Sequence, residues 1–112
     1  MLFPEILGPS IYLICYIPFN IFSSIYNYFY LCTYSDGALK KLYKELITIR
    51  ISVVINCESC MEWHIKEALN SGAERDQIIE SIEVAIEMGG GPATVSSRFP
   101  LKVLDYYKNE SI

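Results

Sequence analysis

The sequence predicts an all-α fold of about five to six helices in a single domain, residues 1–112. Over most of the chain, apolar side chains recur every three or four positions, which is the spacing of one face of a helix. Prolines, glycines and a Ser-Asp-Gly turn separate these stretches. The region 47–55 is rich in β-branched residues and would also suit a strand, but it continues a helical pattern with no breaker. The core is expected to cover about residues 18–108.

The N-terminal third is the least polar part of the chain. Residues 6–35 contain no Asp, Glu, Lys or Arg, a length that could span a bilayer. Pro9 and Pro18 interrupt this run. Four of its polar residues share one helical stripe, at i, i+3, i+4 and i+7: Asn20, Ser23, Ser24 and Asn27. We therefore expect an amphipathic helix that begins near Pro18, in preference to a transmembrane span. Residues 10–17 are expected to form a short helix or strand that Pro18 ends.

Composition indicates a subunit interface. The hydrophobic fraction of 52% is high for 112 residues, so a second buried surface is expected beside the core. The aromatic segment 1–35 suits such a contact, because a tyrosine buries its ring and keeps a polar tip. The net charge of −4, with no basic cluster, argues against a nucleic-acid partner and against electrostatic binding to a membrane.

A long helix is expected from Ala38 to about Ile55, after the turn and cap signal Ser35–Gly37. Its core face is marked by residues at helical spacing: Leu39, Leu42, Tyr43, Leu46, Ile49 and Val53. Glu45 and Arg50 are the charged residues inside its mostly apolar part. A buried charge requires a partner, so both side chains are candidates for a special role.

Three more helices are expected toward the C-terminus. The first runs from Cys57 to about Ser71, with Asn56 as its N-cap and a glycine just past its end. The second covers about Arg75–Met88. Three glycines then break the helix, and a final helix runs from Pro92 to about Lys108, because proline suits a first turn. This last helix is expected to bend near Pro100.

The candidate chemistry lies in Cys57, Cys60 and His64. On a helix these residues fall at i, i+3 and i+7, on one face, and His64 is the only histidine of the sequence. Two thiols in disulfide reach beside a base indicate a redox site, because the thiolate is the reactive form of cysteine. The helix dipole favours a thiolate at Cys57, whereas the imidazole one turn away favours Cys60.

The other two cysteines are expected to have no such role. Cys15 and Cys32 stand alone in apolar surroundings, and we expect them to be small buried side chains that stay reduced. No basic segment precedes an apolar core at the N-terminus, which argues against a secretory signal. A cytoplasmic location is therefore expected, where a CxxC pair indicates redox or metal chemistry.

A longer set of motifs resembles a known family, the carboxymuconolactone decarboxylase superfamily, and more closely its alkylhydroperoxidase D-like (AhpD-like) branch. The resemblance covers about residues 18–105. It is carried by Glu45, by Cys57-x-x-Cys60-x-x-x-His64, by Ala68-x-x-x-Gly72-Ala73 and by Met88-Gly89-Gly90-Gly91-Pro92-Ala93, and Asp36-Gly37-Ala38-Leu39 also fits.

The resemblance implies an AhpD-like helical bundle that assembles as a trimer or hexamer. It also implies a thiol peroxidase or thiol–disulfide oxidoreductase with no bound cofactor. In that scheme Cys60 attacks, Cys57 resolves the oxidised Cys60 as a disulfide, His64 is the base and Glu45 orients or charges it. The branch reduces hydroperoxides with electrons from a dithiol carrier, such as a lipoyl or thioredoxin-like protein. Its best-known peroxidases are longer and have a second histidine between the cysteines, where this chain has Ser59.

Two other classes of function fit the same residues. Cys57, Cys60 and His64 are three ligands of the kinds that zinc accepts, with Glu45 as a fourth. The chain could also be an interaction module that has kept the fold without turnover. Decarboxylation is not expected, because the decarboxylases proper that this chain resembles lack the CxxC pair.

Overall fold

The computed structural model describes residues 19–110, and all of the regular structure in that range is helical. This confirms the predicted all-α fold class. The chain divides into two compact units, residues 1–35 and 36–112, and each is described by itself. In the first unit the described element is α3 (Phe19–Thr33). The second unit contains α4 (Lys41–Val54), α5 (Glu58–Asn70), α6 (Arg75–Ser96) and α7 (Arg98–Glu110).

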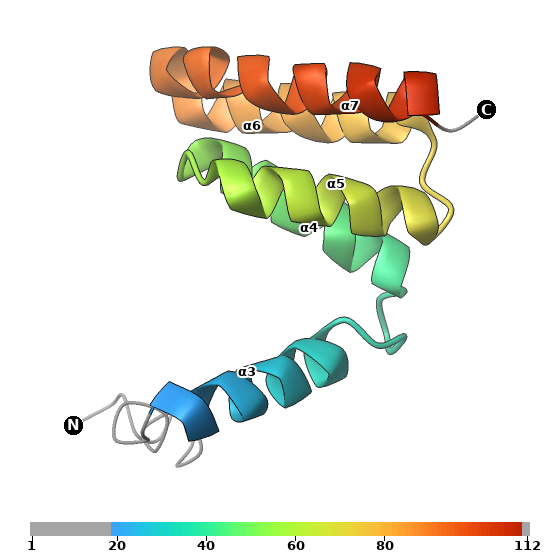
Figure 1. Cartoon of the computed structure of the whole chain (residues 1–112). Helices are drawn as coiled ribbons and strands as arrows, with labels where there is room; N and C mark the ends of the chain where they lie inside the picture. The colour runs from blue at the N-terminus through green and yellow to red at the C-terminus, as the bar shows by residue number, and fades with distance from the viewer. Residues whose placement is uncertain (1–18, 111–112) are drawn as a thin grey trace. The chain divides into compact units, whose positions relative to one another are not determined.

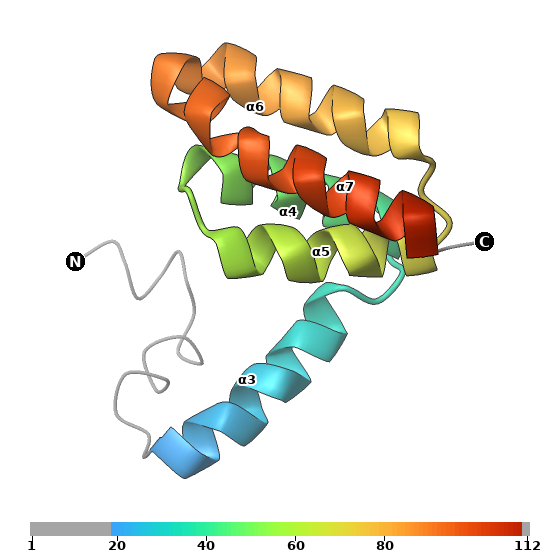
Figure 2. The same cartoon turned by 45° about the horizontal axis from the view of Figure 1, so that its top comes forward.

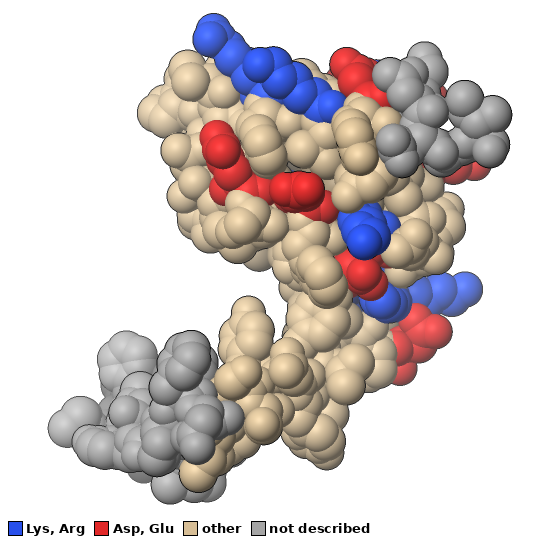
Figure 3. All heavy atoms as spheres, in the orientation of Figure 1, with Lys and Arg blue, Asp and Glu red and all other residues tan. Residues whose placement is uncertain are grey.

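Helix α3 begins directly after Pro18, as the sequence predicts, whereas the segment 10–17 lies outside the described residues. It has no charged side chain, and its described part is uniformly tan in Figure 3. Several of its large apolar side chains are exposed, among them Ile21, Tyr28 and Leu31. Within residues 19–110, no helix combines the length and apolar character that crossing a bilayer requires.

The predicted burial of Cys32 is wrong for the single chain, because Cys32 is an exposed free thiol on α3. Its apolar neighbours in the sequence are themselves largely exposed, so they do not enclose it. The expectation for Cys15 concerns a residue outside the described part of the chain.

The second unit is a four-helix arrangement built from two helical hairpins (Figures 1 and 2). Helix α4 packs against both α5 and α6, and α5 also contacts α7. Side chains from all four helices fill one core: Leu46, Ile49, Val53, Met61, Ile65, Ala68, Ile78, Ile82, Ala85, Ala93, Val103 and Leu104. Full burial of one such aliphatic side chain contributes about 1.5–3 kcal/mol, so this core fixes how α4 lies against its neighbours.

Helix α4 begins at Lys41, three residues later than the predicted start at Ala38. The Asp36 carboxylate accepts a hydrogen bond of 2.7 Å from the backbone N–H of Lys41. Asp36 therefore satisfies one of the unpaired donors at the helix start. Asp36 therefore caps the helix as predicted, but its side chain bonds to the backbone five residues later, because the helix begins at Lys41 and not at Ala38.

The turn between α4 and α5 corrects the role expected for Asn56. Asn56 has a φ of 56°, the left-handed conformation, and lies one residue past the C-cap Ile55. The N–H of Asn56 donates to Val53 O, and the N–H of Cys57 donates to Ser52 O. This is the Schellman pattern, in which asparagine is tolerated because it enters the left-handed region more easily than most residues. Asn56 thus ends α4, and Cys57 is the N-cap of α5.

The connection from α5 to α6 follows the predicted signals. Gly72 adopts a φ of 96° after the C-cap Ser71, and Ala73 N–H donates to Ala68 O. A left-handed glycine is the usual way to satisfy the last carbonyls of a helix. Glu74 and Gln77 then form a capping box that starts α6.

The C-terminal part differs from the predicted single helix over 92–108. Gly90 interrupts α6 with φ 68° and ψ −147°, as the glycine run predicts, but the next break is at Ser97. Helix α7 begins at Arg98, so Pro100 lies in its first turn and does not bend a continuous helix. In an unbroken helix Pro100 would clash with the carbonyl of Ser96, whereas a first turn needs no N–H at that position.

Candidate thiol site

The two cysteines of the CxxC motif lie at the start of α5. Cys57 is the N-cap and Cys60 belongs to the first turn, and the structure joins them by a disulfide with a Cα–Cα distance of 5.2 Å. Both residues are partly buried. The Oγ of Ser59, between them in the sequence, lies 3.6 Å from Cys57 Sγ. Because the helix dipole acts mainly within the first turn, it favours a thiolate at either cysteine after reduction.

A carboxylate from α4 reaches the histidine of α5. Glu45 Oε2 lies 2.6 Å from His64 Nδ1. The Glu45 side chain is 0% exposed and that of His64 is 13% exposed. A carboxylate fully removed from water is costly unless it is paired, so this contact supplies the partner that the sequence requires for Glu45.

The register of the α4–α5 hairpin creates this pair. Lys41 Nζ on α4 lies 3.0 Å from Glu67 Oε2 on α5, which is a second ion pair between the same two helices. Lys41 precedes Glu45 by four residues, and Glu67 follows His64 by three. Because α4 and α5 are antiparallel, a residue one turn earlier on α4 lies opposite a residue one turn later on α5. The Lys41–Glu67 and Glu45–His64 contacts are therefore consistent with a single alignment of the two helices.

All four predicted site residues thus lie in one hairpin of the second unit. Glu45 comes from the second turn of α4, Cys57 is the N-cap of α5, and Cys60 and His64 come from the first two turns of α5. Cys60 and His64 are separated by one helical turn and lie on the same face of α5. The arrangement provides a thiol pair, a base one turn away and a buried carboxylate on that base.

A shallow depression next to the motif includes residues that sequence reasoning did not select. It has a volume of about 220 Å³ and is lined by Ser59, Glu62, Trp63, Lys66 and Tyr107. Burial, with the nearby charges of Glu62 and Tyr106, raises the pKa of the Tyr107 phenol, so Tyr107 remains a hydrogen-bond donor at neutral pH. No sequence signal links Tyr107 on α7 to α5, because their proximity depends on the packing of the bundle.

The geometry of a metal site is a separate question. In the range 19–110, no group of three or more His, Cys, Asp or Glu side chains is placed to hold a metal ion. In this structure Cys57 and Cys60 are bonded to each other. The zinc alternative therefore stays a prediction for the reduced chain.

The helical bundle, the CxxC pair at a helix start and the Glu45–His64 contact are the features expected of the family that the sequence motifs resemble. The model of the carboxymuconolactone decarboxylase family matches residues 21–102, and the chain belongs to this family.

Two curated relatives match over 72 residues, 64% of this chain. Uncharacterized protein 4 in the cox locus of Paracoccus denitrificans is 43% identical over that stretch, and an uncharacterized protein of Cupriavidus necator is 38% identical. The matched stretch spans 65% and 61% of the lengths of these two relatives.

Two solved structures share the fold. A carboxymuconolactone decarboxylase family protein from Legionella pneumophila, solved in its apo form, aligns with a TM-score of 0.72 and 27% identity over 76% of each chain. A family member from Thermotoga maritima, for which a part in an antioxidative response has been suggested, aligns with a TM-score of 0.74 and 22% identity. That alignment covers 80% of this chain and 92% of the other, and it supports the fold alone.

Proposed function

We propose that this protein is a thiol-dependent redox enzyme of the AhpD-like type, which reduces a small hydroperoxide or a disulfide through Cys57 and Cys60. The observation that carries the proposal is the 2.6 Å contact between buried Glu45 and His64, one turn beyond a disulfide-bonded CxxC pair. A simple structural histidine would not require a fully buried carboxylate, which is expensive to desolvate.

The oxidative half of the reaction begins with the reduced pair. His64 takes the proton from the Cys60 thiol, and the thiolate attacks the outer peroxide oxygen, which breaks the O–O bond and releases an alcohol. Cys60 becomes a sulfenic acid. The Cys57 thiol then attacks the Cys60 sulfur, which forms the disulfide and releases water. Two electrons pass from the dithiol to the peroxide, and the first proton leaves with the alcohol.

Glu45 is the positioning residue of this scheme. Its contact with Nδ1 holds the imidazole ring, so the proton is accepted at Nε2. The carboxylate also stabilises the positive charge that the ring acquires when it accepts that proton. Since Glu45 is fully buried, water screens this interaction weakly.

The reductive half returns the enzyme to the dithiol. A dithiol donor, such as a lipoyl or thioredoxin-like protein, attacks the Cys57–Cys60 disulfide and is itself oxidised to a disulfide. If the reduced Cys57–Cys60 pair transfers its electrons to a protein disulfide in place of a peroxide, the enzyme is a thiol–disulfide oxidoreductase. A reducing compartment, the cytoplasm, suits this cycle, and we propose that the enzyme works there as a homotrimer or homohexamer.

Peroxide titration with mass-spectrometric peptide mapping tests the proposal. After reduction and treatment with cumene hydroperoxide, the wild type should lose two free thiols in a Cys57–Cys60 bridge that dihydrolipoamide reverses, while Cys15 and Cys32 stay reduced. Cys60→Ser should consume no peroxide, whereas Cys57→Ser should stop at a sulfenic acid that dimedone traps. Peroxide consumption that is unchanged in Cys60→Ser would refute the proposed attacking thiol.

A further inference from the structure

The hydroxyl of Ser59 is used differently from those of the neighbouring helices. Among the described residues of the second unit, the other serines each donate to a backbone carbonyl three or four residues earlier: Ser52, Ser71, Ser81, Ser96 and Ser97. This is the usual bond of a serine in a helix. Three and four residues before Ser59 stand Asn56 and Ile55, which belong to the turn between α4 and α5. The hydroxyl of Ser59 is therefore available for another acceptor.

That acceptor is a sulfur atom of the disulfide. Ser59 Oγ lies 3.6 Å from Cys57 Sγ, which is within hydrogen-bond reach of an atom as large as sulfur. Because Cys57 Sγ carries no hydrogen in the disulfide, Ser59 is the donor. A disulfide sulfur is a weak acceptor, whereas a thiolate carries a full charge. The bond from Ser59 therefore becomes stronger when the S–S bond breaks and leaves the charge on Cys57.

The two sulfur atoms thus have different polar neighbours. Cys57 has the hydroxyl of Ser59, and Cys60 has the imidazole of His64 one helical turn away. The dipole of α5 acts on both cysteines and does not distinguish them. After the oxidative half-reaction His64 has given its proton to the alcohol. Its free Nε2 accepts a proton from an incoming thiol and has none to give to a leaving sulfur.

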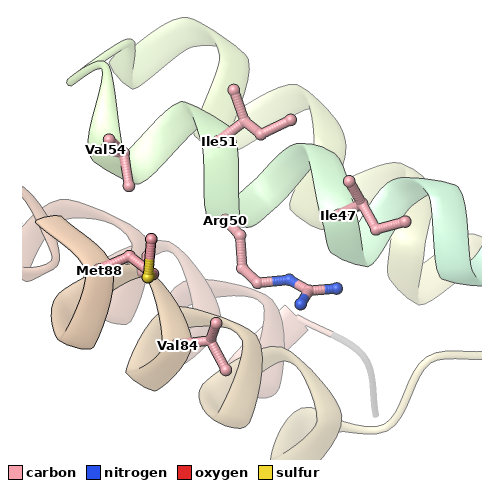
Figure 4. Close-up of a pocket in the computed structure, with 7 residues that line it drawn as sticks. Ile47, Arg50, Ile51, Val54, Val84 and Met88 are labelled. Carbon is pink, nitrogen blue, oxygen red and sulfur yellow. The ribbon is translucent and has the colours of Figure 1, made fainter.

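A larger groove in the second unit does not include these groups. It has a volume of about 370 Å³ and lies between α4 and α6, and Figure 4 shows the side chain of Arg50 extending from α4 toward α6. The residues around Arg50 are aliphatic: Ile47, Ile51, Val54, Val84, Ala85 and Met88. Because neither cysteine, His64 nor Ser59 lines this groove, we assign it no part in the disulfide chemistry. The special role expected for Arg50 stays a prediction.

We propose that Ser59 is a catalytic residue of the reductive half-reaction, in which it stabilises Cys57 as the leaving thiolate and so directs the dithiol donor to Cys60. This inference rests on the proposed function and adds which sulfur the donor attacks. The first donor thiol gives its proton to His64, and its sulfur forms a bond to Cys60 Sγ while the S–S bond breaks. The electron pair of the broken bond stays on Cys57 Sγ, beside the Ser59 hydroxyl, and a stabilised thiolate leaves faster.

The second thiol of the donor completes the reduction. It gives its proton to the Cys57 thiolate and attacks the donor sulfur of the mixed disulfide. Cys60 leaves as a thiolate and takes the proton that His64 holds. The donor departs as a disulfide, and two electrons and two protons have passed to the cysteines.

Reduction rates of the oxidised full chain test the role of Ser59. The disulfide is formed with diamide and reduced with dihydrolipoamide, and N-ethylmaleimide then labels free thiols on the tryptic peptide 51–66, which contains both cysteines. Ser59→Ala should slow reduction about threefold or more, because it removes a hydrogen bond to a developing charge. Ser59→Thr should restore the rate, because it keeps the hydroxyl. Ser96→Ala, which removes a hydroxyl bonded to a backbone carbonyl, should leave the rate unaltered.

The sulfur that is attacked can be identified with a monothiol. When reaction with 2-mercaptoethanol is quenched early with N-ethylmaleimide, mass spectrometry should find mercaptoethanol on Cys60 and the maleimide on Cys57. An equal reduction rate in Ser59→Ala and the wild type, or a mixed disulfide mainly on Cys57, would overturn the proposal. Because diamide and not a peroxide forms the disulfide, both measurements are independent of peroxide consumption. Failure of this inference is therefore distinguishable from failure of the proposed function.

Discussion

Glu45 on α4 and His64 on α5 form a 2.6 Å contact across the hairpin, with the carboxylate completely buried and the imidazole nearly so. The two residues are 19 positions apart in the chain. We propose that this contact links the stability of the α4–α5 hairpin to the reactivity of Cys60, one helical turn from His64. Each of the two effects can be measured separately.

The reactivity of Cys60 should depend on both members of this pair. In a Cys57→Ser background, His64→Ala should slow alkylation by iodoacetamide near neutral pH by about tenfold or more, since general-base contributions are typically about 10²–10⁴. Glu45→Gln should slow it less. The double variant should lose much less than the product of the two single effects, because the residues act as a unit. Rates measured across pH decide this, and an unchanged rate in His64→Ala would show that the helix dipole sets the reactivity.

Substitutions at Glu45 and His64 should also lower the free energy of unfolding. His64→Ala leaves the buried Glu45 carboxylate without its histidine, and breaking a buried pair costs about 3–5 kcal/mol. Glu45→Gln removes the charge and keeps the size, so we expect a loss of about 1 kcal/mol. Combined, the two changes should cost less than their sum. Urea unfolding of the reduced proteins gives these values, with exposed Lys66→Ala as the control that stays within about 0.5 kcal/mol.

Two neighbouring glycines of the run, Gly90 and Gly91, should differ in their sensitivity to substitution. Gly90 has φ 68° and ψ −147°, a region that is essentially restricted to glycine, so Gly90→Ala should cost about 1–3 kcal/mol. The neighbouring Gly91 has an ordinary φ, and a Cβ there would meet no atom within 4 Å. Gly91→Ala should be neutral or slightly stabilising. Thermal unfolding of the two variants compares them directly, and an equal loss at both positions would contradict the assigned strain.

The uncharged helix α3 should contribute to assembly. A helix of 15 residues is only marginally stable by itself in water. Burial of its exposed aromatic and aliphatic side chains against another surface would stabilise it. We expect light scattering at micromolar concentration to give the mass of a trimer or hexamer. Tyr28→Glu on α3 should lower that mass, whereas Tyr106→Glu on α7 should not. A monomer mass for the wild type would contradict the predicted oligomer.

Local sequence patterns predicted the helices well because each depends on neighbours in the chain. The Asp36 cap, the Gly72 terminus and the break at Gly90 all occur where short-range signals place them. The helix boundaries were predicted wrongly where a residue type suits either of two positions near a helix end. Asn56 has the side chain of an N-cap but ends the preceding helix, and Pro100 lies in the first turn of α7 because helix α6 has already ended at Ser97.

The sequence by itself determined the helical class, the CxxC pair with its histidine one turn away, and the need of Glu45 for a partner, since these follow from periodicity, spacing and the cost of a buried charge. The family resemblance implied that Glu45 acts on His64, but only the tertiary structure decided that the two side chains are in contact, because that depends on the register of the α4–α5 hairpin. It also decided that Arg50 faces an apolar groove against α6. Side chains on one helix are ordered by its geometry, whereas contacts between helices depend on the turns and the core that hold them together.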